Sequence, residues 1–388
     1  MFAVFKNARK AAFSALLGIS ALSLAACNPV ALGNGPSINT SKPVKVALLV
    51  PKGSPQSGDS VLAQSLENSA RLAIADLQGV QIDLTIYDTA GDPARAASVA
   101  TEAVNGGAQI ILGPVYAEAA NAAGIAAAKR GVNVLSFSNT PSIAGGNVFI
   151  LGSTFDNSAR RLANFAKRQG KNSFVIASGT NAAGQAGEAA VRRAAAQAGV
   201  TVTGSIGYEL SQQGVINAIP QIRDASAQSD VLFLTATTAG ALPLLTQLLP
   251  EAGVKPGDIQ FVGLTRWDIP AQTLALPGVQ GGWFTLPDPA RATRFRDRYA
   301  SVYGSSPHAI GGLAYDGIAA IGALVGAGNS NALTAAALTQ GAGFQGTGGI
   351  FRLRPDGTND RGLAVATIKE QKVVVIDAAP SSFSGAGF

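Results

Sequence analysis

Short apolar runs alternate with helical patterns along most of the chain, beginning at Val44. Residues 44–50, Val-Lys-Val-Ala-Leu-Leu-Val, have the length and β-branching of a buried strand. A helical pattern follows over 59–78, ends at Gly79, and is followed by an alternating strand over 80–87. The cycle then repeats. Further strands are predicted at 109–112, 132–137, 173–177, 200–206, 231–235, 260–263 and 282–286, and helices at 93–105, 117–130, 157–169, 183–198, 213–228, 238–252, 290–303 and 309–325.

This order of elements predicts an α/β fold. Strand, helix and strand joined by short turns form right-handed βαβ units, which build mostly parallel sheets covered by helices. Several such units precede Gln280, enough for two sheets. The pattern changes near the C-terminus, where strands predicted at 349–353, 363–369 and 373–377 indicate a β-meander that closes one lobe.

The N-terminal segment has the parts of an export signal. Lys6, Arg9 and Lys10 precede an apolar stretch at 11–26 that ends in Leu-Ala-Ala before Cys27. The stretch resembles a lipobox, which implies that Cys27 is acylated after residues 1–26 are removed. The alternatives are a transmembrane anchor, for which the stretch is short, and an ordinary signal peptide with an incidental cysteine. Residues 27–43 are predicted to be a flexible tether between the lipid and the folded domain.

Composition fits a globular chain and excludes several functions. Of the 388 residues, 47% are hydrophobic and 13% charged, which is enough apolar content for two cores. The formal charge of +6 falls to +3 when the three N-terminal cations leave, and the remaining cations are scattered, so no nucleic-acid partner is predicted. The chain has one cysteine and one histidine, His308, which sits at a helix start. We therefore predict no metal site, no cofactor, no catalytic residues and no enzymatic activity.

One glycine pattern could suggest a nucleotide site. Residues 341–346, Gly-Ala-Gly-Phe-Gln-Gly, fit the spacing of the dinucleotide fingerprint. That motif needs a strand before it and a helix after it, whereas here a helix precedes and the strand at 349–353 follows. These glycines are instead predicted to allow a tight passage between lobes.

Polar loops follow the predicted strands of both halves. Parallel α/β sheets bind ligands at the carboxyl ends of their strands, where helix N-termini also favour anions. Residues of this kind lie at 51–58, 113–118, 136–141, 178–181, 235–238 and 264–267. Each loop could equally serve only to cap its helix. Together they predict a polar cleft.

Several of these segments resemble the type I periplasmic-binding protein family, in particular the leucine/isoleucine/valine receptors. The resemblance rests on residues 46–51, 87–93, 110–114, 134–140, 314–317 and 346–357, and extends over nearly all of 44–378. It implies two lobes that close on a solute, joined by passages near 152–155, 284–287 and 347–349. The first lobe would comprise 44–152 and 287–347, the second 153–286 and 348–378, and residues 379–388 would form a tail.

The resemblance also implies a ligand site. Ser54, Ser138 and Thr140 would donate to the solute from the first lobe, with Tyr116 packing beside it. Thr237 and Arg266 would approach from the second lobe, and Trp267 would shape the pocket. Two departures from the amino-acid receptors stand out: Ala117 lacks the expected hydroxyl, and neither Thr265 nor Arg266 is the acid that would hold an ammonium group. The implied ligand is an amino-acid-like or carboxylate-bearing molecule, with Arg266 binding its carboxylate.

A second branch of the same fold is an alternative. Residues 46–51, 87–90, 111–115 and 135–139 are also similar to lipoprotein activators of penicillin-binding proteins, which bind a cell-wall synthase instead of a solute. Asn28, which follows the lipidated cysteine, favours the outer membrane over the inner. The leading prediction is a periplasmic, lipid-anchored solute receptor for an ABC importer, and the alternative is an activator of peptidoglycan synthesis.

Overall fold

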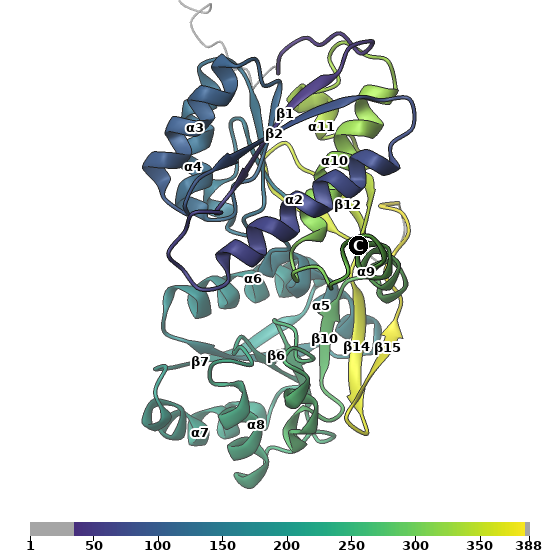
Figure 1. Ribbon diagram of the computed structural model, residues 1–388. Helices are drawn as coiled ribbons and strands as arrows, with labels where there is room; N and C mark the ends of the chain where they lie inside the picture. Colours follow the sequence, from purple (N-terminus) through teal and green to yellow (C-terminus); the bar gives the residue numbers. More distant parts are fainter. Residues whose placement is uncertain (1–34, 385–388) are drawn as a thin grey trace, which may run out of the picture.

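The computed structural model describes residues 35–384, which fold into two lobes stacked one above the other (Figure 1). Each lobe is built around its own mostly parallel sheet flanked by helices, as the alternation of strands and helices predicts. The predicted signal peptide at 1–26, Cys27 and residues 28–34 of the predicted tether lie outside the described residues. Within residues 35–384, no helix combines the length and apolarity that crossing a membrane requires.

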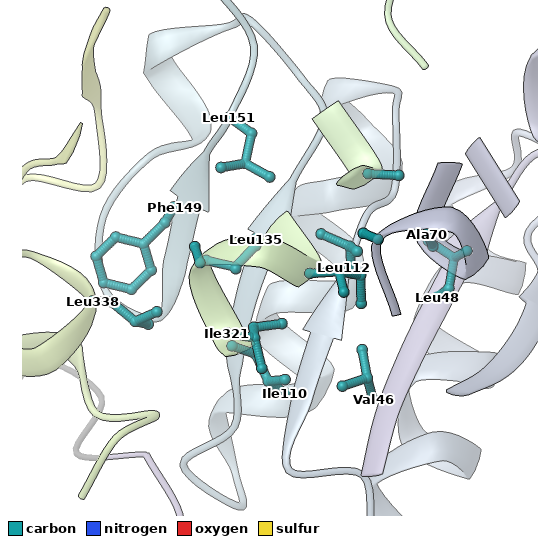
Figure 2. Close-up of a cluster of buried hydrophobic side chains, with 14 of the residues drawn as sticks. Val46, Leu48, Ala70, Ile110, Leu112, Leu135, Phe149, Leu151, Ile321 and Leu338 are labelled. Carbon is teal, nitrogen blue, oxygen red and sulfur yellow. The ribbon is translucent and has the colours of Figure 1, made fainter. Parts of the chain in front are cut away.

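The first lobe has a five-stranded parallel sheet in the order β2-β1-β3-β4-β5. Along β1, Val46, Leu48 and Val50 enter the core on one face while Ala47 and Leu49 enter the core on the other, as the two-residue period of a strand requires. Figure 2 shows part of the first core, where Ile321 lies near Ile110. The strands are β1 (Val44–Val50), β2 (Ile82–Asp88), β3 (Ile110–Leu112), β4 (Asn133–Ser136) and β5 (Val148–Ile150). The helices are α2 (Asp59–Asp76), α3 (Pro93–Asn105), α4 (Ala117–Ala128), α10 (Gly312–Gly326) and α11 (Ala335–Leu338), with a 3₁₀ turn at Pro141–Ile143.

The second lobe has a seven-stranded mixed sheet in the order β15-β14-β10-β9-β8-β6-β7. Its last two strands form a hairpin that pairs antiparallel with β10, so the C-terminal segment closes this lobe. The strands are β6 (Ser173–Gly179), β7 (Thr201–Tyr208), β8 (Val231–Leu234), β9 (Gln260–Gly263), β10 (Trp283–Leu286), β14 (Ala364–Lys369) and β15 (Lys372–Asp377). The helices are α5 (Phe155–Arg168), α6 (Ala182–Ala198), α7 (Gln212–Ser226) and α8 (Leu242–Glu251), with 3₁₀ turns at Ala271–Ala275 and Pro277–Val279.

A small antiparallel sheet lies where the chain passes between the lobes. It consists of β11 (Phe344–Gly346), β12 (Gly349–Leu353) and β13 (Asn359–Arg361), and α9 (Pro289–Tyr303) runs beside it. The predicted meander is thus divided, because β12 pairs with β11 and β13 while β14 and β15 join the second sheet. Phe351 and Leu353 pack in the first core, whereas Ala364 and Ala366 pack in the second. The lobe limits given above stay a prediction.

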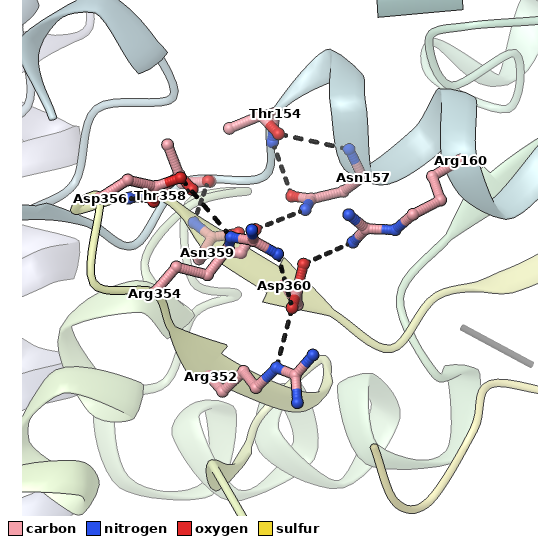
Figure 3. Close-up of polar contacts among 10 residues, drawn as sticks. Thr154, Asn157, Arg160, Arg352, Arg354, Asp356, Thr358, Asn359 and Asp360 are labelled. Atoms are coloured by element: carbon pink, nitrogen blue, oxygen red, sulfur yellow. Dashed lines mark hydrogen bonds and ion pairs between the residues drawn. The ribbon is translucent and has the colours of Figure 1, made fainter. Parts of the chain in front are cut away.

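Polar contacts fasten two of the interlobe passages to each other (Figure 3). The buried Asn359 side chain donates to the carbonyls of Ile150 and Gly152, at 2.8 Å each. The Asn157 side chain, in the first turn of α5, donates to the Asn359 carbonyl at 2.9 Å. Backbone carbonyls buried in this region therefore have donors, and the two passages are held as one unit.

Candidate functional site

A cavity of about 650 Å³ lies between the two lobes. Its wall on the first lobe is formed by the loops that follow β3 and β4, and its wall on the second lobe by the loop that follows β9 and the end of β10. The chain passages near Thr154, Pro287 and Arg361 line it as well, as does Thr347 between β11 and β12. The cavity therefore occupies the position at which strand ends of both sheets face each other, where open α/β sheets bind ligands.

The start of helix α4 faces this cavity with free backbone donors. Tyr116 is the N-cap residue, and its side chain does not cap the helix. The first intrahelical bond to the cap is made by the Ala120 amide, which donates to the Tyr116 carbonyl at 2.8 Å. The amides of the preceding turn are therefore available to an anion in the cavity, where Tyr116 and Ala117 form part of the wall.

Ser138 and Thr140 lie next to this helix start. The Ser138 amide donates to the Ser136 hydroxyl at 3.1 Å, and the Thr140 amide donates to the Ser138 hydroxyl at 3.2 Å. These bonds fix the loop after β4 while leaving the Ser138 hydroxyl proton free to donate. Both side chains line the cavity, so the first-lobe wall presents hydroxyl and amide donors together.

The Tyr116 hydroxyl is engaged by another residue and is not available to donate to a solute. It donates to the buried carboxylate of Asp59 at 2.5 Å. Burial, followed by this hydrogen bond and the charge of Asp59, raises the pKa of Tyr116 to about 12. The phenol is therefore neutral at physiological pH, and it is held against α2 so that the ring forms the cavity wall.

The second-lobe wall contains an arginine that already has a partner. Both Nε and Nη2 of Arg266 donate to the carboxylate of Asp268, the Nε bond at 2.8 Å. The Thr265 hydroxyl is likewise used, since it donates to the Ala236 carbonyl at 3.1 Å. Because the Arg266 fork faces Asp268, the pair adds little net positive charge to the cavity.

The floor of the cavity is a buried ion pair between Asp316 of α10 and Arg361 of β13, at 3.5 Å. Asp316 also accepts from the Thr347 amide at 2.6 Å, and Arg361 donates through Nε to the Leu151 carbonyl at 2.9 Å. Burial raises the pKa of the Asp316 carboxyl, an effect that Arg361 and Thr347 oppose. The pair ties α10 to β13 and to the segments at Thr347 and Leu151. The two charged side chains are engaged with each other.

These contacts leave the cavity lining without a free acidic group among the described residues. Among the described residues that line it, Asp316 is the one carboxylate, and it is 1% exposed. An ammonium group in the cavity would therefore meet no free acid. Apolar side chains make up much of the remaining wall, including Val115, Phe137, Leu264, Leu286 and Leu363. No group of three or more His, Cys, Asp or Glu residues within 35–384 is arranged to hold a metal ion.

The structure brings together four of the residues predicted to bind a ligand. Tyr116, Ser138, Thr140 and Arg266 line the cavity. Ser54 and Thr237 do not: the Ser54 hydroxyl accepts from the Gln56 amide at 3.1 Å within its own turn, and Thr237 is exposed at the turn before α8.

Trp267 also lies outside the cavity lining, in the second core, with 0% of its surface exposed. Its ring occupies the space left by two glycines, since a Cβ on Gly263 or Gly282 would come within 2.2 or 2.3 Å of it. The tryptophan therefore packs beneath the site instead of forming the pocket wall.

The Asp316–Arg361 floor was not predicted from the sequence. Asp316 belongs to the Tyr-Asp-Gly segment that carried part of the family resemblance, but at a helix position its role could not be distinguished from a structural one. Arg361 lies in a strand of three residues, too short to be predicted from periodicity. A buried acid and a distant arginine are brought together only by the fold.

Comparisons with known proteins agree on one architecture. A sequence profile of a family described as periplasmic binding protein matches residues 43–372. A solved structure from Rhodospirillum rubrum, described as that of a candidate branched-chain amino acid ABC transporter, is 19% identical with a TM-score of 0.74, covering 86% of this chain and 100% of that one. A comparison with curated proteins gives no match.

Two further solved structures are similar and contain ligands. A solute-binding protein of an ABC transporter from Rhodopseudomonas palustris, in complex with 3,4-dihydroxybenzoic acid, is 19% identical with a TM-score of 0.59, covering 87% of this chain and 98% of that one. An ABC transporter substrate-binding protein from Desulfitobacterium hafniense, in complex with leucine, is 17% identical with a TM-score of 0.64, covering 86% of this chain and 100% of that one.

Proposed function

Since the chain belongs to the periplasmic binding protein family, we propose that it captures a small carboxylate-bearing solute between its lobes for delivery to an ABC importer. The observation that supports this most directly is the uncapped start of α4, which faces the interlobe cavity beside Ser138. Backbone amides at a helix N-terminus and a neighbouring hydroxyl are suited to a carboxylate. Binding involves no chemical turnover in this proposal.

The solute we propose has an apolar body and no ammonium group. The cavity walls are rich in aliphatic and aromatic side chains, and the one carboxylate among the described lining residues is engaged by Arg361 and Thr347. An ammonium group would have to give up its water without gaining an ionic partner. Of the ligands in the similar structures, 3,4-dihydroxybenzoic acid has a carboxyl group and no ammonium group, and so it suits this cavity lining better than leucine.

A matched pair of ligands tests the proposal. Leucine and 4-methylpentanoate share a carbon skeleton and a carboxylate, and differ by the α-ammonium group. We expect 4-methylpentanoate and benzoate to raise the melting temperature of the protein, since a ligand at about 100 times its Kd stabilises by about 2.7 kcal/mol. Leucine should have a much smaller effect. Stabilisation by leucine alone would show that the ammonium is recognised, and indifference to all three would remove support for carboxylate capture.

Two variants locate the binding contact. Ser138→Ala should weaken 4-methylpentanoate binding by about tenfold, the effect of one hydrogen bond to a charged group. Ser54→Ala is the matched control, because Ser54 carries the same hydroxyl but does not line the cavity. Titration calorimetry on both variants distinguishes the two, and equal affinities would place the carboxylate elsewhere.

We also propose that the protein is exported to the periplasm and anchored through lipid on Cys27, with the outer membrane favoured by Asn28. Cys27→Ser should abolish labelling by radioactive palmitate in growing cells, and persistent labelling would contradict lipid attachment at this residue. The alternative role, activation of a cell-wall synthase, predicts indifference to solutes and co-purification with the synthase. The ligand tests above therefore separate the two roles.

A further inference from the structure

A second cavity, of about 610 Å³, lies beside helix α9. It is bounded by the end of α2, by α9 and α10, and by β11. Thr347 is the one described residue that lines both this cavity and the interlobe cavity. The second cavity is therefore separate from the proposed solute site, although the two meet at Thr347.

Arginines dominate the charge of this second cavity. Arg291, Arg294 and Arg298 line it from α9, and Asp76 is the one acid among its described lining residues. Three guanidinium groups thus face a single carboxylate, which leaves an excess of two positive charges. Arg291 and Arg294 are three positions apart on one helix, so their side chains leave the same face.

The acid in this cavity is already occupied. Asp76 accepts from Arg298 at 3.0 Å through one oxygen and from the Tyr315 hydroxyl at 3.0 Å through the other. Arg291 reaches its nearest carboxylate, Asp288, only at 3.9 Å. Arg294 makes no hydrogen bond or ion pair with any residue between 35 and 384. Two guanidinium groups therefore retain most of their capacity to bind an anion.

The rest of the lining supports an occupant with a polar head. Phe295 and Tyr315 meet edge to face at 5.6 Å, which gives the cavity a rigid aromatic side. Gln345 adds an uncharged amide from β11. No further acid among the described lining residues would repel a negative group.

We propose that this cavity, which we call the α9 anion site (Arg291, Arg294, Arg298, Tyr315 and Gln345), binds a phosphate group. A phosphate carries between about 1.5 and 2 negative charges at neutral pH, which corresponds to the excess of positive charge in the site. Guanidinium groups match its oxygens in bidentate geometry. The phosphate can belong to a soluble molecule or to a lipid headgroup, and the chemistry of recognition is the same.

Inorganic phosphate is the soluble probe. We expect calorimetric titration of the full chain carrying Cys27→Ser, at low ionic strength, to show saturable binding of one equivalent. Arg294→Gln should weaken it by at least about tenfold, the effect of one lost charged hydrogen bond. Arg296→Gln is the matched control, because Arg296 lies on the same helix but does not line the site and donates to Thr293. Arg294 is exposed, so its variant should keep the parent's circular dichroism spectrum and melting temperature.

Sedimentation with phosphatidylcholine vesicles, with and without phosphatidate, tests the lipid source in the same variants. Binding that depends on Arg294 but not on Arg296, in either experiment, supports the α9 anion site and identifies its source. Equal losses in the two variants would indicate diffuse charge attraction and overturn the proposal. Failure to bind in both experiments would overturn it as well. Neither outcome bears on the solute site, whose ligand tests do not involve α9.

Discussion

At the scale of single residues, the Arg266–Asp268 pair sets how much positive charge the second lobe offers to a solute. Arg266 lines the interlobe cavity and donates to Asp268 through two nitrogens. An arginine predicted from its position as the main carboxylate contact is thus largely neutralised by an acid two residues away. Sequence places these residues close together, but whether their side chains meet depends on rotamers that only the folded loop determines.

Freeing Arg266 should strengthen carboxylate binding. Asp268→Asn removes the competing charge, and we expect the affinity for 4-methylpentanoate to rise by about threefold to tenfold, less than a buried charged bond would give because the Arg266 side chain is 39% exposed. Arg266→Ala in the otherwise unchanged protein should alter affinity much less. Calorimetric titrations measure both, and an unchanged or weaker affinity in Asp268→Asn would show that Arg266 does not face the solute.

Asp360 makes stability depend on pH in the acid range. Burial raises the pKa of this carboxyl, but Arg160, Arg352 and Arg354 more than offset burial, so the pKa lies below its ordinary value. A lowered pKa in the folded state adds stability above the unfolded pKa, and this stability is lost as the pH falls below about 4. Figure 3 shows Asp360 between Arg160 and Arg352, which it meets at 2.6 and 2.8 Å.

Removing this carboxylate should therefore flatten the acid dependence of stability. Asp360→Asn should lower the free energy of unfolding by about 1–3 kcal/mol at neutral pH and by progressively less as the pH falls below about 4. Asp258→Asn is the control, because Asp258 is exposed and its side chain makes no hydrogen bond or ion pair with any residue between 35 and 384. Urea unfolding across the acid range measures the effect, and parallel curves for the parent and Asp360→Asn would contradict it.

At the scale of elements, helix α10 reaches the first sheet through its glycines. A Cβ on Gly317 would lie 2.4 Å from a methyl group of Leu112, which is fully buried and cannot easily move aside. A Cβ on Gly326, in the last turn of the same helix, would lie 3.4 Å from the nearest atom, on Val80. Close packing of α10 also positions Asp316, one residue before Gly317, at the cavity floor.

The two glycines should respond oppositely to alanine. Gly317→Ala should lower the free energy of unfolding by about 1–3 kcal/mol, because the added methyl overpacks the core. Gly326→Ala should be neutral or stabilising by up to about 1 kcal/mol, because alanine favours the helix and its methyl group would make an ordinary van der Waals contact with Val80. Chemical denaturation compares them directly, and a tolerated Gly317→Ala would mean that α10 can shift away from the sheet.

Long, strongly patterned elements could be predicted from the sequence, and most strands of three residues could not. The predicted strands at 44–50 and 349–353 coincide with β1 and β12, and the helix predicted at 59–78 differs from α2 by two residues. Three of the four described strands of three residues, β5, β11 and β13, were missed because so few residues carry no measurable period, whereas β3 was predicted at 109–112. The same limit concealed the cavity floor, since Arg361 belongs to β13. The polar loops predicted after β3, β4 and β9 supplied the four cavity residues that were found.

At the scale of the whole molecule, two separate cores are joined by passages that are themselves tied together. Asn359 donates to carbonyls on the passage from β5 to α5 and accepts from Asn157 of the second lobe. These contacts cross between the lobes at sequence separations of about two hundred residues. We therefore expect that destabilising one lobe also lowers the unfolding midpoint of the other, as long as Asn359 is present.

The tryptophans allow this coupling to be measured, because the chain has two and both lie in the second lobe: Trp267 in its core and Trp283 in β10. Asn147→Ala removes two buried hydrogen bonds within the first lobe, to the carbonyls of Gly124 and Val132, and should cost about 1–3 kcal/mol. With the lobes coupled, tryptophan fluorescence should report this loss although the substitution lies in the other lobe.

Adding Asn359→Ala should uncouple the tryptophan signal of the second lobe from the stability of the first lobe. In the double variant, the fluorescence midpoint in urea should lie above the midpoint from far-ultraviolet circular dichroism, because the second lobe no longer follows the weakened first lobe. The Asn359→Ala single variant controls for the two hydrogen bonds lost at the passage itself. If Asn147→Ala leaves the tryptophan midpoint of the otherwise intact protein unchanged, the lobes unfold independently, and the contacts of Asn359 hold the passages without coupling the two cores.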